Sequence, residues 1–420
     1  MLARWRAKAR EVLRALGPGV TTGAADDDPS GIATYSVVGA QFGTGFLWAS
    51  WVTFPLMGAV QMMCARVGMV TGMGLAGALR EKFPRALVAL IALALLIANV
   101  INIAADLSGM ADSAQMLGGG SSHVWVWVFG LGICVATVWL RYHQIANALK
   151  WLALALLAYV ATAFLVTHDW PAVLKATALP SLPHGSAAWA ALVALLGTTI
   201  SPYLFFWQAG QEVEEEKAKG RLMLISRKGA TAAELHDRRI DIGAGAFFSN
   251  VVMFFVILTT AMTLHEHGIT SINTTRDAAQ ALKPLASNGA YLLYTLGLVG
   301  TGLLAIPTLA GSAAYAFAET FDWAHGLDER FRNAGAFYGV FILATVAGAA
   351  LDEFNVDPIK ALYWSAIVNG LLAPFLLVAL LLVATDARIM DGQTSSLLSR
   401  WVVVITTVLM FGAAVGMFVF

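Results

Sequence analysis

The chain has 420 residues, of which 58% are hydrophobic and 12% are charged, and its formal net charge is zero. Soluble domains carry about a quarter charged residues, so this composition excludes a soluble protein and indicates a polytopic membrane protein. The zero net charge says nothing about partners, because in membrane proteins the placement of Lys and Arg matters more than their sum.

Runs of about 20 apolar residues recur along the whole chain, and each is long enough to cross a hydrocarbon core of about 30 Å as a helix. We therefore expect an all-α protein with eleven transmembrane helices. The expected spans are residues 19–42, 46–68, 86–116, 122–141, 147–167, 187–210, 241–263, 289–318, 334–351, 360–384 and 399–420.

The basic residues follow these spans asymmetrically. If the N-terminus is cytoplasmic, all but four of the 26 basic residues fall before the first span or in cytoplasmic connections. This bias predicts a multi-pass protein of the plasma or inner membrane with a cytoplasmic N-terminus and an external C-terminus. We expect residues 1–17 to lie along the inner membrane surface and the polar stretch 211–239 to be a solvated connector. The four exceptions are Lys175, Arg276, Lys283 and Lys360.

The first and sixth spans are interrupted by polar residues and proline. The first contains Asp26-Asp27-Asp28 directly before Pro29, and the sixth contains the run 197–203 around Pro202. A carboxylate in the membrane costs several kcal/mol, and proline frees backbone carbonyls that need another partner. A bound cation would supply that partner, so the sequence predicts a cation site.

The two interruptions stand five spans apart, which predicts an inverted repeat. A unit with an odd number of spans that is repeated at once must be inserted upside down, as in many secondary transporters. We expect one transmembrane domain over 1–420, made of a cytoplasmic segment (1–17), a first repeat (19–167), a second repeat (187–384) and an eleventh helix (399–420). The alternative is that both prolines only kink packed helices.

Asp28 is the best candidate for an ion ligand, because the residue before proline is pushed out of helical geometry and its carboxylate can turn into the gap. Successive helical positions differ by about 100°, so at most one neighbour, Asp27, could share the cavity, and other acids there would face a wet vestibule or unwound backbone. Across the gap we expect the Thr198 carbonyl and the Ser201 hydroxyl as ligands. The Thr199 and Tyr203 side chains would lie one step further out.

All of these donors are oxygens, which suit Mg²⁺, Ca²⁺ or Mn²⁺ better than softer transition metals. None of the 14 methionines falls in either interrupted segment, and Met57 is interpreted as a packing residue. One carboxylate and a few neutral oxygens do not strip Mg²⁺ of its waters. Because Gly31 and Ser201 are small, we expect a roomy site for a partly hydrated ion.

Two other spans carry polar residues that could belong to the pathway. Asn102 and Asp106 share one face of the third span at helical spacing, so both can point toward the pore. Asp106 would tune the pathway or pair with a polar group on a neighbouring helix. Asn369 in the tenth span would line the cavity or serve helix packing.

Several of these motifs together resemble the Nramp divalent-metal transporters, in order and over most of the chain. The resemblance implies a LeuT-type fold. The matching runs are Gly17-Pro18-Gly19, Asp28-Pro29-Ser30-Gly31, Gly39-Ala40-Gln41-Phe42-Gly43 followed by Leu47-Trp48, Ala105-Asp106-Leu107, residues 197–203 and the glycine-rich residues 297–311.

The departures from the family pattern concern the site itself. The family's Asp-Pro-Gly-Asn signature has Gly31 at the asparagine position, and its Met-Pro-His signature reads Ser201-Pro202-Tyr203 here. A glutamate that typically follows the third-span aspartate by three residues is replaced by Gly109. These changes resemble the Nramp-related magnesium transporters, which implies transport of Mg²⁺ and Mn²⁺ without obligatory proton coupling.

We therefore expect an importer of Mg²⁺, and also Mn²⁺, that works by alternating access. Two charges moving through 100 mV release about 2 × 2.3 kcal/mol, enough for roughly thousandfold accumulation without a coupled proton. The alternatives are a proton-coupled Mn²⁺ or Fe²⁺ importer and a cation-coupled symporter for an organic solute. We expect no enzymatic activity, no cofactor, no nucleic-acid partner and no obligatory protein partner; the partners are the metal substrate and the lipid bilayer.

Overall fold

The computed structural model describes residues 18–139, 153–354 and 356–420. The expected inner-surface segment 1–17 and the first part of the expected fifth span lie outside the described residues. Within them the chain forms helices and turns and contains no strand, which confirms the all-α class.

The helices divide into those that form the bundle and short ones that connect them. The bundle helices include two pairs, α2 with α3 and α11 with α12, whose members are separated only by a short break. In chain order they are α2 (Pro18–Asp26), α3 (Pro29–Phe42), α4 (Leu47–Thr71), α6 (Arg85–Gly118), α7 (Ser122–Trp139), α9 (Leu157–Val166), α11 (Ser186–Thr199), α12 (Pro202–Ala218), α14 (Ala232–Thr263), α17 (Ala290–Phe321), α18 (Gly335–Leu351), α19 (Pro358–Ala384) and α20 (Leu397–Val419). The short ones are α5 (Leu75–Arg80), α10 (Trp170–Ala178), α13 (Leu224–Arg227), α15 (Thr275–Ala279) and α16 (Lys283–Ala286).

The described residues contain nine segments that are long and apolar enough to cross a membrane. One of them, Pro29–Thr71, holds the expected first and second spans, because the chain turns at Gly43 (φ +57°) between α3 and α4. The ten-residue α9 is the described end of the expected fifth span. The nine segments therefore account for ten of the eleven expected spans, and α9 belongs to the remaining one, the fifth.

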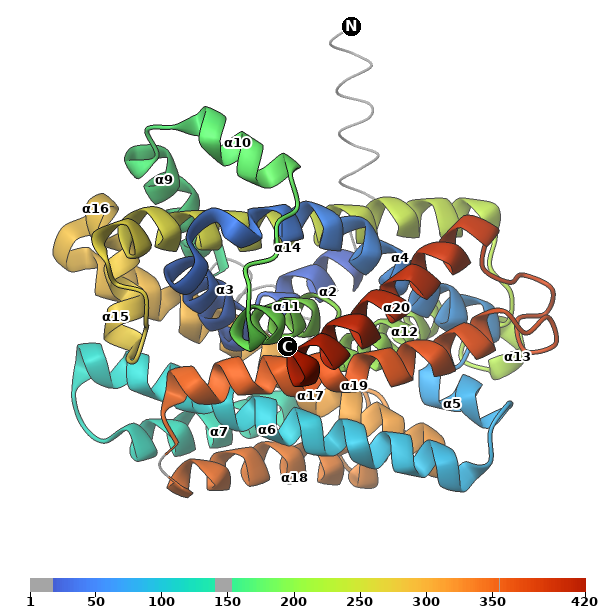
Figure 1. Cartoon of the computed structure of the whole chain (residues 1–420). Coiled ribbons are helices and arrows are strands. Elements are labelled where there is room, and N and C mark those ends of the chain that lie inside the picture. Colours follow the sequence, from blue (N-terminus) through green and yellow to red (C-terminus); the bar gives the residue numbers. More distant parts are fainter. Residues whose placement is uncertain (1–17, 140–152, 355) are drawn as a thin grey trace, which may run out of the picture.

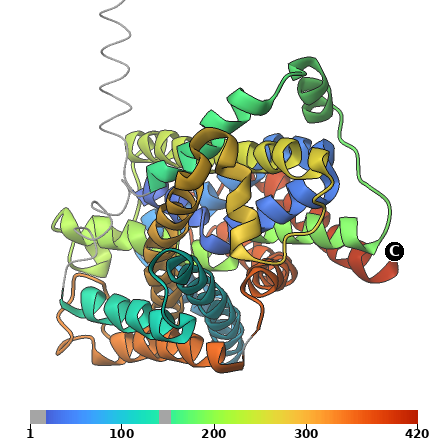
Figure 2. The same cartoon turned by 90° about the vertical axis from the view of Figure 1, so that its left-hand side faces the viewer.

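The long helices lie side by side, with their connections gathered at two ends of the bundle (Figure 1). Helix α14 packs against α2, α3 and α4, α17 packs along α6, and α11 packs against α19 and α20. Helices α9, α10, α15 and α16 mark one end, and α5, α13 and the connection before α20 mark the other (Figures 1 and 2). Segments from both halves of the chain thus enclose the centre.

Both expected helix breaks are present. The first span stops at Asp26 and resumes at Pro29, and the sixth stops at Thr199 and resumes at Pro202. Proline suits the first position of a helix because its ring fixes φ and it lacks an N–H that would have no partner there. Asp28 caps α3, since its extended backbone (ψ 172°) lets its side chain accept from the Gly31 N–H. The same residues that stop one half-helix therefore start the next.

The first half-helix, α2, lies unusually close to α14. A Cβ on Gly23 would fall 2.5 Å from the Gly245 carbonyl carbon, and one on Gly19 would fall 2.7 Å from the Ile242 nitrogen. Small residues four apart let helix backbones approach in this way. The Gly19 N–H also donates to Asp241 Oδ2 at 2.7 Å, so both backbone packing and a hydrogen bond hold α2 to α14.

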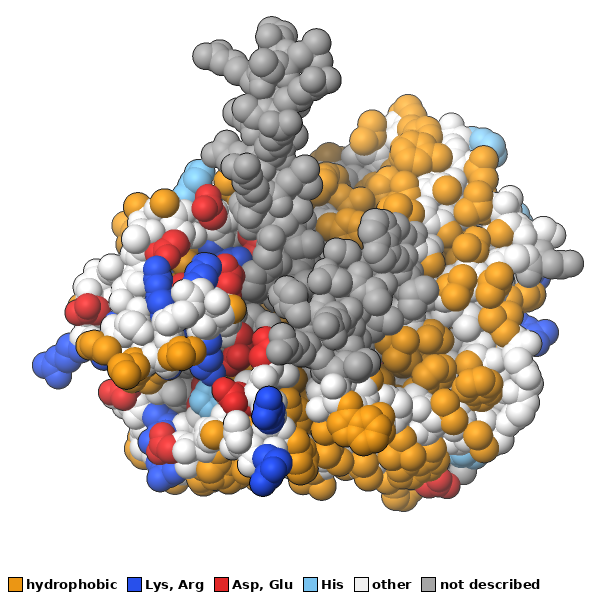
Figure 3. Space-filling view, turned by 180° about the vertical axis from the view of Figure 1, so that it is seen from behind, with side chains coloured by type: hydrophobic (Ala, Val, Ile, Leu, Met, Phe, Trp, Pro, Cys, Tyr) orange, Lys and Arg blue, Asp and Glu red, His pale blue; other side chains and the backbone are white. Residues whose placement is uncertain are grey.

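The stretch 211–239 is only in part the solvated connector that its charge pattern predicts, because residues 218–226 are mostly exposed but both ends pack into the bundle. Most of it belongs to α12 and α14, and Glu212, Glu216 and Arg238 are buried. Arg238 of α14 pairs with Glu212 of α12, and Arg221 of the connection pairs with Glu216. Figure 3 shows most Lys, Arg, Asp and Glu side chains of that face gathered at one end, beside a broad hydrophobic surface.

Candidate metal site at the two helix breaks

Asp28 is the centre of a buried hydrogen-bond network at the first break. Its Oδ1 accepts from the Gly31 N–H at 2.6 Å. Its Oδ2 accepts from Asn102 Nδ2 at 2.9 Å and from the Ser30 hydroxyl at 3.3 Å. These donors fix the carboxylate and favour its charged form, while each oxygen keeps lone pairs for a further partner.

A chain of amides extends this network across three helices. Asn102 Nδ2 on α6 also donates to Asp106 Oδ2 at 3.2 Å, and Asn102 Oδ1 accepts from Asn369 Nδ2 on α19 at 3.1 Å. The structure thus brings together Asp28, Asn102, Asp106 and Asn369, which the sequence places in the first, third and tenth spans. We call these four residues and Thr198 the central polar cluster.

Thr198 joins the cluster through its hydroxyl. A Cβ on Gly31 would lie 2.8 Å from Thr198 Oγ1 and 3.2 Å from Asp28 Oδ1, so these oxygens from the two breaks converge on the bare face of Gly31. The Thr198 carbonyl, which we expected to be the ligand, instead accepts from the Ser201 hydroxyl at 2.8 Å. Ser201 shares its hydrogen with the Gly197 carbonyl at the same distance. Ser201 therefore satisfies the carbonyls that the break releases.

The central polar cluster has more acceptors than donors. Asp106 Oδ1, Thr198 Oγ1 and Asn369 Oδ1 are buried and have no hydrogen-bond partner. No Lys, Arg or His of the described residues forms an ion pair with Asp28 or Asp106. The described residues also contain no group of three His, Cys, Asp or Glu side chains arranged to hold a metal. Any cation here would thus be bound mainly by neutral oxygens and water around few carboxylates.

Asp26 and Asp27 point away from this cluster, toward α14. The Ser249 hydroxyl lies 2.6 Å from Asp26 Oδ2 and 3.2 Å from Asp27 Oδ1. Both carboxylates are buried, so neither faces the wet vestibule or binds the unwound backbone as the sequence suggested. The structure does not place Asp27 in one cavity with Asp28, because Asp27 contacts α14 and Asp28 contacts α6.

The remaining predicted positions serve the helices around the break. Thr199 Oγ1 donates to the Leu195 carbonyl of its own helix at 2.8 Å, so the structure does not bring this side chain to the cluster. The Tyr203 hydroxyl donates to the Ala25 carbonyl at 3.1 Å and thereby joins α12 to the end of α2. Tyr203 thus links the two broken spans directly.

Near the breaks, Asn99 escaped the sequence analysis, and Met57 was interpreted there only as a packing residue. Met57 on α4 lines a hollow with the segment 199–201, and its sulfur accepts from Asn250 Nδ2 at 3.5 Å. This hollow is too small for a water molecule, so the roomy site expected beside Ser201 is absent from this conformation. Asn99 donates to the Leu309 carbonyl and to Ser312 on α17. Its spacing of three from Asn102 could have revealed it; Met57 gave no such signal.

A second buried group of charges lies where α12 meets α14. Arg238 forms ion pairs with Glu212 (2.8 Å), Glu215 and Asp241. Gln208 Nε2 donates to Glu212 Oε1 at 2.7 Å. We call Arg238, Glu212, Glu215 and Asp241 the inner charge cluster. Because Asp241 also accepts a hydrogen bond from the Gly19 N–H, this cluster connects α2 to both α12 and α14.

Comparisons with known proteins agree with this architecture. The family model described as "Natural resistance-associated macrophage protein-like", Nramp, matches residues 19–420. A divalent metal cation transporter of Klebsiella pneumoniae strain 342, named MntH, is 26% identical over 409 residues, covering 94% of this chain and 91% of that protein.

Solved structures show the same fold at low sequence identity. A manganese transporter of Eremococcus coleocola superposes with a TM-score of 0.76 at 17% identity, covering 96% of this chain and 85% of that one. A Na⁺-coupled sialic acid symporter in an outward-open state gives 0.54 at 11% identity, covering 98% and 97%. These likenesses confirm the expected fold, and the breaks in the first and sixth spans are those described above.

Proposed function

This chain belongs to the Nramp family of membrane transporters, and from that premise we propose that it imports Mg²⁺, and Mn²⁺ as a second substrate, without obligatory proton coupling. Transport would proceed by alternating access, with the N-terminus in the cytoplasm and the C-terminus outside. A substrate ion would cross the membrane through the central polar cluster and undergo no chemical change.

One observation carries the proposal: the central polar cluster buries acids and unpartnered oxygens with no basic residue to neutralise them. Asp28 and Asp106 are both buried, and Asp106 Oδ1, Thr198 Oγ1 and Asn369 Oδ1 lack partners. Uncompensated buried charge is costly in a membrane. A divalent cation would supply the missing positive charge, and it can be coordinated by carboxylate, hydroxyl and amide oxygens alike.

The substrate ion would be held with part of its water shell. Asp28 would provide the electrostatic anchor, and the Thr198 hydroxyl would face it across the bare side of Gly31. Asp106 and Asn369 would act through bound water, because Mg²⁺ usually keeps several waters. Ser201 would contribute its remaining lone pairs. The hollow beside Ser201 would have to widen for this, so binding would require movement of the half-helices.

The proposed lack of proton coupling rests on Tyr203 and the membrane potential. The position that resemblance associates with a histidine holds Tyr203, whose hydroxyl is engaged by the Ala25 carbonyl. A phenol does not change its charge near neutral pH, whereas an imidazole does. Since the potential alone supports roughly thousandfold accumulation, a coupled proton is dispensable.

The inner charge cluster would form part of the cytoplasmic gate. Helix α2 is held to α14 by the close approach of Gly23 and by the bond from Gly19 to Asp241. In transporters of this plan, one bundle rocks against the rest around the central site. Opening toward the cytoplasm would therefore require α2 to leave Asp241.

The test is metal flux into liposomes with the internal pH recorded. We expect wild-type protein to take up Mg²⁺ and Mn²⁺ without acidification of the lumen. Asp28→Ala should abolish uptake of both ions, whereas Asp112→Asn, which changes a half-buried carboxylate of α6 outside the cluster, should transport normally. Normal flux in Asp28→Ala would refute the site. Stoichiometric acidification in the wild type would refute uncoupled transport.

A proton-coupled Mn²⁺ importer is the alternative that Met57 favours. Its thioether lies beside the second break and would suit a softer metal. Competition in the same liposomes separates the two functions. Excess Mg²⁺ should inhibit Mn²⁺ uptake if the oxygen site carries both ions, and it should have no effect if the thioether selects Mn²⁺.

A further inference from the structure

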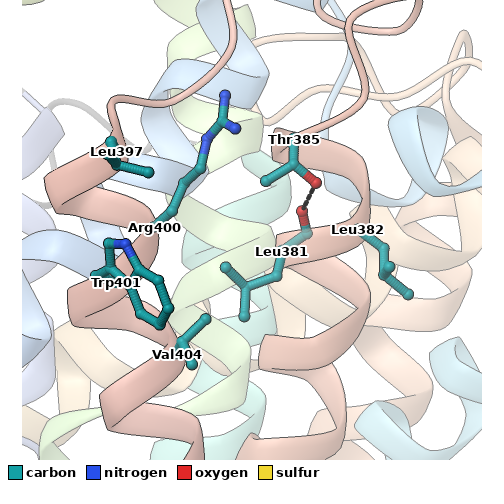
Figure 4. Close-up of a pocket in the computed structure, with 7 residues that line it drawn as sticks. All are labelled: Leu381, Leu382, Thr385, Leu397, Arg400, Trp401 and Val404. Carbon is teal, nitrogen blue, oxygen red and sulfur yellow. Dashed lines mark hydrogen bonds between the residues drawn. The ribbon is translucent and has the colours of Figure 1, made fainter.

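A groove opens to the outside of the bundle between α19 and α20. It has a volume of about 290 Å³ and lies where α19 ends and α20 begins, at the end of the bundle that also holds α5 and α13 (Figure 1). Figure 4 shows its apolar side chains projecting from the two helices, with the Arg400 guanidinium at one end. The apolar wall consists of Leu381, Leu382, Leu397, Trp401 and Val404.

The groove faces the surroundings of the protein. Leu397 is 69% exposed, Trp401 59% and Leu382 43%. For a span at the edge of a membrane protein these surroundings are lipid, and Trp side chains are enriched where lipid tails meet the headgroups. The position of Trp401 in the second turn of α20 thus fits the level of the membrane interface.

Arg400 brings a positive charge to this apolar groove and has no acidic partner. Its Nε donates to the Ser395 carbonyl and its Nη2 to the Thr394 hydroxyl, both at 2.7 Å. No carboxylate of the described residues lies within ion-pairing distance, and Nη1 makes no hydrogen bond there. The two bonds fix the guanidinium, so a free donor edge is held in place beside the groove.

We propose that this groove binds an anionic phospholipid, with an acyl chain along Leu381, Leu397 and Val404 and the phosphate on Arg400. A fixed guanidinium suits a phosphate because it presents several N–H donors in a planar fork. Basic pockets between transmembrane helices on the cytoplasmic side are recognised sites for acidic headgroups. The groove supplies the tail contacts and Arg400 supplies the selectivity, and neither depends on the identity of the transported ion.

Native mass spectrometry of the full chain tests the proposal. The protein is released from micelles that contain phosphatidylglycerol or phosphatidylcholine with identical acyl chains. We expect preferential retention of phosphatidylglycerol by the wild type and a loss of about fivefold in Arg400→Gln, the scale of one cation near an anionic surface. Equal retention of the two lipids by the wild type would overturn the proposal.

Matched variants separate the site from general charge effects. Arg388→Gln changes an exposed arginine in the connection between α19 and α20, outside the groove, and should retain phosphatidylglycerol like the wild type. Arg400→Lys should retain most binding, which shows that a lost charge rather than misfolding explains Arg400→Gln. If Arg388→Gln loses as much lipid as Arg400→Gln, the binding is diffuse and the site is refuted.

Two further experiments distinguish binding of the acyl chain from binding of the headgroup. Val404→Phe fills the groove and leaves Arg400 unchanged, so it should also lower phosphatidylglycerol retention. Inorganic phosphate at millimolar concentration should not displace the lipid, because it lacks the apolar tail. Full retention in Val404→Phe, or displacement by phosphate alone, would show a headgroup site without a lipid groove and would overturn the proposal as stated.

Discussion

The central polar cluster and the inner charge cluster both bury carboxylates inside the helix bundle, but they neutralise them differently. In the inner charge cluster Arg238 pairs with three acids, two of them fully buried. In the central polar cluster no cation pairs with Asp28 or Asp106, and the amide of Asn102 donates to both carboxylates. Amide donors orient a carboxylate but do not cancel its charge.

On the proposed function, this difference separates an acid that stabilises the fold from an acid that would bind the transported ion. The two charges of a buried ion pair neutralise each other, and removing one partner leaves the other charge uncompensated. A buried acid without a basic partner has its negative charge neutralised only when it binds a proton or a cation. The structure alone thus indicates which of the two clusters is suited to an exchangeable ion.

The largest effect should follow from breaking the inner charge cluster. Arg238→Met leaves Glu212 and Asp241 buried without their cation, and we expect unfolding in detergent to become easier by about 3–5 kcal/mol. The neighbouring Arg239 is exposed, so Arg239→Met is the matched control and should change stability little. Equal stability of the two variants would contradict the assignment of Arg238 as a structural charge.

The central polar cluster should behave in the opposite way. We expect Asp28→Asn to fold about as stably as the wild type without metal, because it removes an uncompensated charge and keeps the shape. Saturating Mg²⁺ should stabilise the wild type by about 2.7 kcal/mol at a hundredfold excess over Kd and leave Asp28→Asn unchanged. Thermal unfolding with and without Mg²⁺ measures this, and an equal shift in both proteins would exclude Asp28 as the anchor.

Gly31→Ala tests whether the bare face of this glycine is needed. The added methyl would lie 2.8 Å from Thr198 Oγ1, so it would either push the two helix breaks apart or block access of the ion to Thr198 and Asp28. We expect Mg²⁺ uptake to fall about tenfold, equivalent to roughly 1.4 kcal/mol, in a flux assay. Gly132→Ala on α7, where a methyl meets nothing within 4 Å, is the control and should transport normally.

Ser201→Met should change selectivity more than activity. A thioether at this break favours Mn²⁺ over Mg²⁺, so the ratio of Mn²⁺ to Mg²⁺ uptake should rise by roughly fivefold, or about 1 kcal/mol. Ser201→Ala separates the gain of sulfur from the loss of the hydroxyl that serves the Gly197 and Thr198 carbonyls. The same ratio in both variants would show that sulfur plays no part.

The smallest effect concerns a surface pair outside the membrane-spanning segments. The Arg80 guanidinium hydrogen-bonds Asp322 and lowers the pKa of that carboxyl below its usual range. The resulting stability is present above the pKa of the unfolded state, about 3.9, and is lost as the pH falls through the lower folded value. Asp322→Asn should cost less than about 1 kcal/mol at pH 7 and flatten the acid limb of the stability curve. An unchanged acid limb would show that the pair contributes nothing.

The sequence alone determined the features that depend on local geometry. Proline beside polar residues predicted both helix breaks, and the spacing of four placed Asn102 and Asp106 on one face of α6. Steric limits on backbone angles and the helical period act within a few residues, so the sequence contains them in full.

Only the tertiary structure decided which groups meet across helices. Asp27 binds Ser249, which lies 222 residues away, instead of the central polar cluster. The Thr198 hydroxyl, not its carbonyl, converges with Asp28, and Arg238 turns a charge run into a buried cluster. The helical period fixes the direction in which a side chain leaves its own helix, but the partner that it meets depends on how helices distant in the sequence pack together.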